Sequence, residues 1–164
     1  MSLTYHEERL YQAIAFMRNL RFDAPLPDAW VGGRSLYEWF RGAVAGIVVE
    51  TCENSWCCQP PKVIHICRSA EAPVYDWRRT IDRMWLGVLV HEARHADTNR
   101  PHTCPTDQTK DARVADMGSF GVQYWLDLWI AEHSDQPDDI REWYRHSYRS
   151  IRLSAFCLEC ANSR

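Results

Sequence analysis

The stretch of sequence that decides the fold is Leu86-Gly87-Val88-Leu89-Val90-His91-Glu92-Ala93-Arg94-His95-Ala96. It begins with an apolar run, and apolar side chains recur through it at the three- and four-residue spacing of a helix. Asp76 can cap this helix at its start, while Asn99 and Pro101 are signals for its end. We therefore predict a buried helix between these two points.

Two histidines stand four residues apart in this stretch. Residues at that spacing lie one above the other on a helix, so the imidazoles of His91 and His95 can reach one metal ion. Zinc suits them, because neutral imidazole is a preferred ligand and a catalytic zinc needs three protein ligands with a fourth position open to water. Glu92 lies beside the pair, where it can accept a proton from water that the zinc activates. The alternative is a pair of histidines on a partly buried helix without a metal.

The motif His91-Glu92-Ala93-Arg94-His95 resembles the signature of the zincin metallopeptidases, which lies on a buried active-site helix. The resemblance covers residues 86–97, together with a strand ahead of the helix and helices after it. It implies that His91 and His95 bind Zn²⁺ and that Glu92 is the general base of peptide-bond hydrolysis. It also implies that a strand at residues 62–68 is the sheet edge on which an extended peptide substrate lies. Arg94 departs from the uncharged residues usual at its place in the motif.

The resemblance offers two choices for the third zinc ligand. In the metzincin branch a third histidine follows the helix, and His102, seven residues after His95, resembles it. Residues 116–121 also resemble the methionine turn of that branch. In the gluzincin branch an acidic ligand comes from a later helix, and residues 112–116 resemble that pattern, although Ala112 occupies the ligand position and leaves only Asp116. Because the helix stop returns the chain towards the metal within a few residues, we predict His102 as the third ligand and Asp116 as the alternative.

Further polar side chains could support such a site. A polar stripe on the next predicted helix either faces solvent or faces inward and orients the metal-binding imidazoles. The stripe consists of Asp116, Ser119, Gln123 and Asp127. Asp97 is another candidate for orienting a ligand, and Cys104 either binds zinc as a thiolate or packs as a small apolar side chain. The candidates for stabilising the oxyanion are Tyr124, His133 and His146.

Capping signals and helical periodicity predict four further helices. They cover residues 4–20, 35 to about 47, 111–132 and 135 to about 160. Two β-branched segments, Ile47–Thr51 and Lys62–Arg68, favour a pair of antiparallel strands. No linker divides the chain. We therefore predict one domain over residues 1–164, of the α+β class and mostly α, as a compact zincin-like domain with a small antiparallel sheet or hairpin ahead of the active-site helix.

The composition fits a single domain of ordinary size. The chain has 164 residues, of which 46% are apolar, and its 19 basic residues nearly balance its 22 acidic ones. That balance provides no overall field for binding nucleic acid or an anionic membrane. No apolar run approaches the ~20 residues of a bilayer span, and the N-terminus lacks the pattern of a secretory signal. We expect a cytoplasmic protein with no nucleic-acid or membrane partner, while the sequence leaves secretion open.

The seven cysteines are uneven in their spacing. In a reducing compartment most of them would pack as small apolar side chains. A second metal site is an alternative for the cluster at residues 52–58 together with the pair Cys157 and Cys160.

These observations favour a small zinc metallopeptidase, a hydrolase that acts on a peptide or protein substrate. The alternative is a non-catalytic, zinc-stabilised helical interaction module that presents an arginine-rich last helix to a partner. The arginines of that helix are Arg141, Arg145, Arg149 and Arg152. A charged stripe opposite an apolar one is usually the solvated face of a surface helix, which favours the enzyme.

Overall fold

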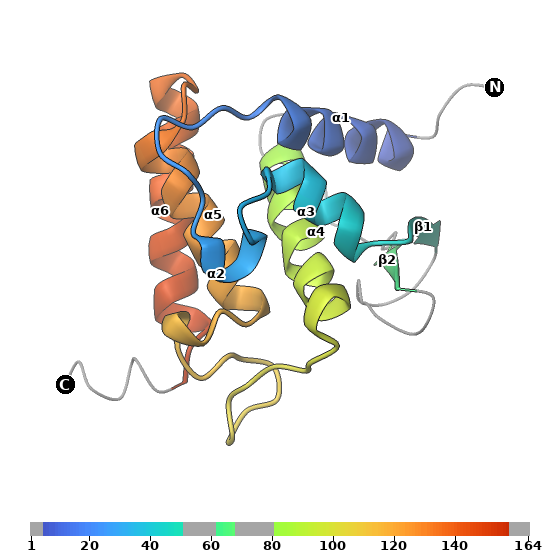
Figure 1. Ribbon diagram of the computed structural model, residues 1–164, viewed down its shortest axis with the longest axis vertical. Helices are drawn as coiled ribbons and strands as arrows, with labels where there is room; N and C mark the ends of the chain where they lie inside the picture. Colours follow the sequence, from blue (N-terminus) through green and yellow to red (C-terminus); the bar gives the residue numbers. More distant parts are fainter. Residues whose placement is uncertain (1–4, 51–61, 68–80, 158–164) are drawn as a thin grey trace.

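The computed structural model describes residues 5–50, 62–67 and 81–157. These ranges form helices, one short 3₁₀ turn and two strands, so the fold is α+β and mostly α, as predicted (Figure 1). In chain order the elements are α1 (Tyr5–Asn19), α2 (Asp28–Val31), α3 (Leu36–Ala43), β1 (Gly46–Glu50), β2 (Val63–Cys67), α4 (Ile81–Thr98), the 3₁₀ turn (Val114–Asp116), α5 (Ser119–His133) and α6 (Asp138–Ser154). Within these ranges no helix is both long enough and apolar enough to cross a bilayer.

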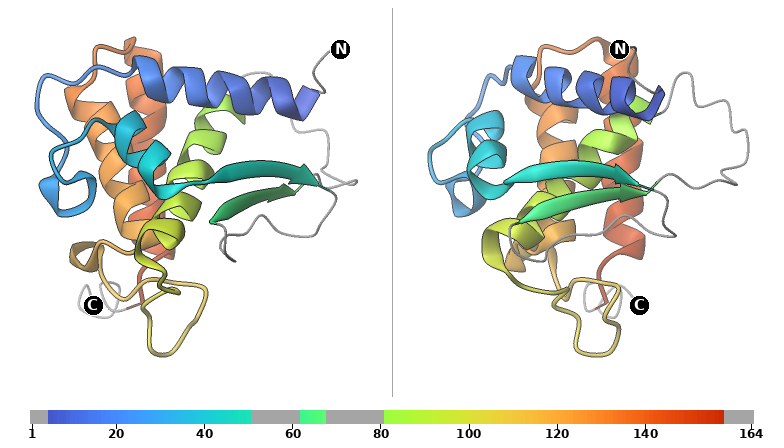
Figure 2. Two further views of the ribbon diagram at one scale, coloured as in Figure 1. Left: turned by 45° about the vertical axis from the view of Figure 1, so that its right-hand side comes forward. Right: turned by 90° about the vertical axis from the view of Figure 1, so that its right-hand side faces the viewer.

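Helix α4 lies at the centre of the molecule. Most of its apolar run is buried, since Leu86, Leu89 and Val90 have no exposed surface. Helices α1, α3 and α5 and strand β2 all pack against α4. The sheet lies on one side of α4, and α5 and α6 lie side by side on the other (Figures 1 and 2). The buried helix predicted from the sequence is therefore the element that the others cover.

The two strands pair in parallel, so the prediction of an antiparallel pair is wrong. Gly46 pairs with Val63 and Glu50 with Cys67, and both strands run in the same direction (Figure 2). A hairpin needs only a short turn, whereas parallel strands need a crossover of about a dozen residues or more. Residues 51–62 separate these strands and provide that length. The β-branched composition identified the strands but carries no information about their relative direction.

The start of α3 agrees with its capping signal in the sequence. The side chain of Ser35 accepts the N–H of Glu38, and Glu38 accepts the N–H of Ser35, as the predicted capping box requires. The predicted caps at Thr4 and Asp76 lie outside the described residues. Short helix α2 lies between the first two predicted helices and was not predicted. Helix α3 ends at residue 43 and α6 at residue 154, before the predicted ends near residues 47 and 160.

The helix predicted to begin at Asp111 begins instead at Ser119. Residues 111–118 form an irregular segment that contains the 3₁₀ turn. Met117, directly after that turn, adopts the left-handed conformation, at φ 50°. The carboxylate of Asp111 accepts the N–H groups of Phe120 and Gly121, in the first turn of α5. Asp111 therefore caps the helix from outside it, because the residue before the helix, Gly118, has no side chain that can do so.

A disulfide joins Cys104 to Cys157 and links the loop after α4 to the end of α6. Cys104 is therefore neither a thiolate ligand nor a free packing residue, and Cys157 is not available for a second metal site. The other cysteines of that predicted site, residues 52, 57, 58 and 160, lie outside the described residues. Beside the disulfide, Asp111 and Phe156 form an isolated parallel bridge, so the loop is fixed to α6 at two points.

Asp127 is a buried acid between α5 and α6. It is 1% exposed, and its Oδ2 accepts a hydrogen bond from Ser147 Oγ at 2.6 Å. Its Oδ1 has no hydrogen-bond partner among the described residues. Burial raises the pKa of Asp127 from 3.8 to about 7, and the hydrogen bond from Ser147 offsets only part of this effect.

We predict that Asp127→Asn stabilises the protein at neutral and alkaline pH. Between pH 3.8 and about 7 the unfolded chain releases the Asp127 proton and the folded chain keeps it, so the stability of the unaltered protein falls as pH rises through this window. An amide cannot ionise, and the variant escapes this loss, which is at most about 4 kcal/mol for three pKa units. Urea unfolding should show that the free energy of unfolding of the variant exceeds that of the unaltered protein by a margin that grows up to about pH 7 and is constant above it.

The matched control is Asp135→Asn, which alters an exposed acid in the loop before α6. The difference in free energy of unfolding between this variant and the unaltered protein should stay constant with pH. An advantage of Asp127→Asn that is equally constant would show that the buried carboxyl does not titrate in this way.

Candidate metal centre

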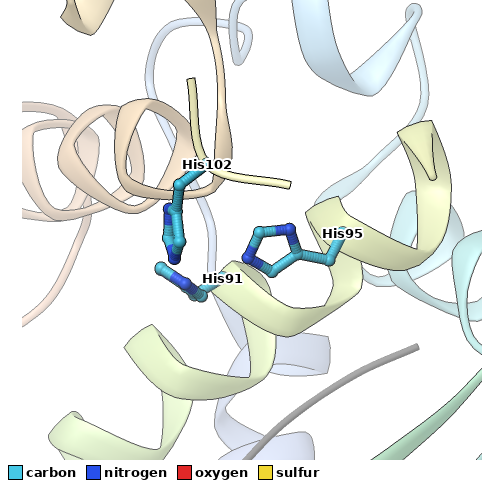
Figure 3. A group of neighbouring side chains, drawn as sticks. All are labelled: His91, His95 and His102. Carbon is cyan, nitrogen blue, oxygen red and sulfur yellow. The ribbon is translucent and has the colours of Figure 1, made fainter. Parts of the chain in front are cut away.

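Three histidines converge beside the centre of α4. His91 and His95 come from α4 and His102 from the loop that follows it, and their rings point towards one another (Figure 3). One ring nitrogen from each lies within 4.8 Å of the other two. The ring centroids of His95 and His102 are 4.8 Å apart. The structure therefore brings the three side chains that were predicted as ligands to one place.

The end of α4 brings His102 to this place. Asn99 adopts the left-handed conformation, at φ 52°, and its N–H donates to the carbonyl of His95. An asparagine tolerates this conformation better than most residues do, so it ends the helix as the sequence predicted. The chain then reverses and returns His102 within three residues.

Each histidine also has a hydrogen-bond partner behind the cluster. His95 Nδ1 lies 2.7 Å from the carbonyl oxygen of Arg100. His102 Nδ1 lies 3.3 Å from Asp111 Oδ1, and His91 bonds to the side chain of Gln123. Carbonyl and carboxylate oxygens only accept, so Nδ1 carries the proton in His95 and His102 and the lone pair of Nε2 is left for a metal. Metal-binding histidines are held in this way.

Burial favours the neutral form of His91 and His95. Burial is the main cause that lowers the pKa of His91 to about 3, and positive charge on His95 and His102 contributes to the same shift. Burial also lowers the pKa of His95, against the opposing effect of its bond to Arg100. The ring of Phe120 covers the cluster, with its centroid 4.4 Å from that of His91. Neutral imidazole is the form that binds a metal.

Two glycines allow the partner residues to approach. A Cβ at Gly87 would lie 2.7 Å from Gln123 Nε2, and one at Gly118 would lie 2.5 Å from Asp111 Oδ2. Both distances are shorter than real Cβ contacts. An alanine at either place would push away a side chain that bonds to one of the histidines.

The predicted polar stripe of α5 faces inward. Ser119 is 2% exposed, and its Oγ lies 3.2 Å from His102 Nδ1, while Gln123 bonds to His91. Asp127, further along the helix, bonds to Ser147 and not to a histidine. The fourth member, Asp116, is exposed in the 3₁₀ turn before the helix and does not belong to the cluster. The structure thus brings His102 to the pair and leaves the alternative ligand outside.

Asp97 has a different role from the predicted one. It accepts hydrogen bonds from Trp39 Nε1 and from Arg94, and not from a histidine. Arg94 also donates through Nε to the carbonyl of Met117 at 2.8 Å. The charged residue that departs from the usual motif therefore joins α4 to the turn before α5.

The three candidates for oxyanion stabilisation lie away from the histidine cluster. Tyr124 packs with Phe156 and Tyr148 in a second apolar cluster, where α5 meets α6. His133 bonds to Asp23 at the other end of α5, and His146 is paired with Glu142 on α6. None of the three contacts a cluster histidine in the described part of the chain.

Asp111 is the residue of this site that sequence reasoning missed. The sequence placed it at the start of a helix, whereas it lies in the turn and contacts His102. One signal was present, since a helix that begins after a glycine needs an acceptor from elsewhere for its first N–H groups. That signal shows that an acceptor is needed but does not identify it.

The arginines of α6 are largely engaged within the molecule. Arg141 Nε donates to the carbonyl of Ala131, and Arg145 bonds to Glu132 and Glu142. Arg149 lies over the ring of Tyr148. The contacts of Arg141 and Arg145 use two of the four charged groups that the interaction-module alternative would present to a partner, while Arg149 and Arg152 are exposed.

The comparisons with known proteins give no match: no protein-family model, curated protein or solved structure is similar to this chain. The chemistry of the site therefore has to be argued from its residues.

We predict that His102→Ala lowers zinc affinity by more than ~100-fold. Loss of a residue that only orients a ligand typically costs up to ~100-fold, and loss of the ligand itself should cost more. Asp116→Ala is the matched control, because it removes the alternative ligand that the structure leaves outside the cluster. Competition with a chromophoric chelator measures both affinities. If Asp116→Ala lost zinc and His102→Ala kept it, the third ligand would be the aspartate.

Proposed function

We propose that the protein is a zinc-dependent hydrolase, and specifically a small metallopeptidase. The observation that supports this best is the convergence of His91, His95 and His102, with one ring nitrogen of each within 4.8 Å of the others. Glu92, the residue after the first of these histidines, is 8% exposed on the same helix. Three imidazoles are a donor set that suits a catalytic zinc, and a buried carboxylate next to them in the sequence suits a general base.

The residues present fit a zinc ion in number and kind. Zinc takes imidazole nitrogens at ~2.0–2.1 Å, which places them roughly 3.3 Å apart in a tetrahedral site. The three rings would therefore draw slightly closer together on binding. The partners behind them, Arg100, Asp111 and Gln123, already direct the rings. When bound, zinc would lower the pKa of a water molecule towards ~7 and polarise a substrate carbonyl.

Glu92 is the proposed general base. Its place next to His91 on α4 fixes it near the cluster, and its burial strengthens its electrostatic interactions. In the proposed reaction its carboxylate takes a proton from the attacking water and then gives it to the leaving amine. His91, His95 and His102 hold the ion and exchange no proton.

The proposed substrate is an extended segment of a peptide or protein. Strand β2 packs against α4 and pairs with β1 on one edge. Among the described residues β2 has no strand on its other edge. Such an edge presents backbone N–H and carbonyl groups that can pair with an extended peptide, which would lie next to the helix that carries the histidines.

We predict that Glu92→Gln keeps zinc and fold but lowers hydrolysis by ~10²- to 10⁴-fold, because an amide cannot take the proton from water. The assay uses the zinc-loaded protein and fluorescein-labelled casein, with zinc content and far-UV circular dichroism measured in parallel. Glu142→Gln, at an exposed glutamate of α6, is the control and should keep full activity.

Equal rates for Glu92→Gln and the unaltered protein would remove Glu92 from the mechanism. Zinc binding without cleavage of casein or of a peptide library by the unaltered protein would favour the interaction module instead.

A further inference from the structure

Asp111 is a fully buried carboxylate that belongs neither to the histidine cluster nor to an ion pair with Lys or Arg among the described residues. Its exposed fraction is 0%, and it lies nine residues beyond His102 in the chain. Burying a charged carboxylate is costly unless hydrogen bonds replace the water that it loses. The hydrogen bonds that Asp111 makes therefore indicate what the residue is for.

The two carboxylate oxygens of Asp111 face two different parts of the site. Oδ1 lies 3.3 Å from His102 Nδ1 and accepts the N–H of Thr103 at 3.3 Å. Oδ2 accepts the N–H of Phe120 at 2.7 Å and that of Gly121 at 3.3 Å. One oxygen thus holds the segment that carries the third histidine, and the other holds the start of α5, where Ser119 and Phe120 contact the same histidine.

The backbone of Asp111 is itself fixed. Its N–H donates to the carbonyl of Ala155, and its carbonyl accepts the N–H of Cys157. The disulfide between Cys104 and Cys157 closes the loop at the same end of α6. The carboxylate is therefore held from the side of α6 and does not depend on His102 for its position.

We propose that Asp111 is the positioning residue of the third metal ligand. It accepts the Nδ1 proton of His102, fixes the tautomer with the Nε2 lone pair free, and turns the ring towards His91 and His95. This role rests on the zinc site of the proposed function and does not require that the site hydrolyse peptides. Residues that hold a metal-binding histidine in this way typically contribute 10- to 100-fold to metal affinity.

A carboxylate is needed here because all four neighbours are donors. Asparagine has the same shape, but it offers one acceptor oxygen and one NH₂ group, so it must turn a donor towards either His102 or the start of α5. Asp111→Asn should therefore lower zinc affinity by ~10- to 100-fold. Asp107→Asn is the matched control in the same loop, because Asp107 bonds to Thr109 and not to a histidine.

The deciding experiment measures zinc affinity for Asp111→Asn in two backgrounds, the unaltered protein and His102→Ala. A residue that acts mainly through His102 should have its full effect in the first background and a much smaller one in the second, where only the interaction of its charge with His91 and His95 is left. A residue that only stabilises the fold should lower affinity equally in both. Urea unfolding of the zinc-free proteins identifies any loss of fold.

A second variant covers the case in which Asp111→Asn does not fold. Gly118→Ala keeps the carboxylate but places a Cβ 2.5 Å from its Oδ2, so the carboxylate must shift. Gly118→Ala alone should bind zinc more weakly than the unaltered protein. Added to His102→Ala, it should not weaken zinc binding further.

Normal zinc affinity in folded Asp111→Asn, or an equal loss in both backgrounds, would overturn the role of Asp111. The failure of the proposed function has a different signature. If the unaltered protein bound no zinc, or if His102→Ala bound it normally, the metal site itself would be wrong, and the role of Asp111 would be overturned with it.

Discussion

The structure depends on the burial of α4. This helix carries an apolar run whose Leu86, Leu89 and Val90 have no exposed surface, and α1, α3, α5 and β2 cover it. The same burial takes His91 and His95 out of water and keeps their imidazoles neutral. Buried imidazoles in turn need hydrogen-bond partners, which the loop after α4 and helix α5 provide. The core of the fold and the candidate site are thus consequences of one buried helix.

The loop between α4 and α5 joins the two halves of the site. It delivers His102 through the left-handed turn at Asn99 and ends at Met117, whose carbonyl accepts a hydrogen bond from Arg94 on α4. Between these points the disulfide of Cys104 and the backbone of Asp111 attach it to α6. A loop with no long regular element of its own is therefore held at both ends and in the middle, which fixes the position of His102.

Local patterns predicted those parts of the site and fold that depend on local geometry. The four-residue spacing placed His91 and His95 on one face of a helix, and the stop signal at Asn99 placed His102 near them. Helical periodicity also put Ser119, Gln123 and Asp127 on one face, but it could not assign their partners, which lie on three different elements. The direction of the strands, the pairing of Cys104 with Cys157 across 53 residues and the role of Asp111 all depend on contacts between distant segments. No periodicity in one chain encodes such contacts.

The proposed function requires that His91, His95 and His102 hold one zinc ion. X-ray absorption spectroscopy of the zinc-loaded protein tests it directly, together with the zinc content per chain. The account predicts one tightly bound zinc per chain, with nitrogen or oxygen neighbours at ~2.0–2.1 Å and the outer-shell scattering of three imidazoles. Sulfur neighbours at ~2.3 Å, or a spectrum with fewer than three imidazoles, would contradict it.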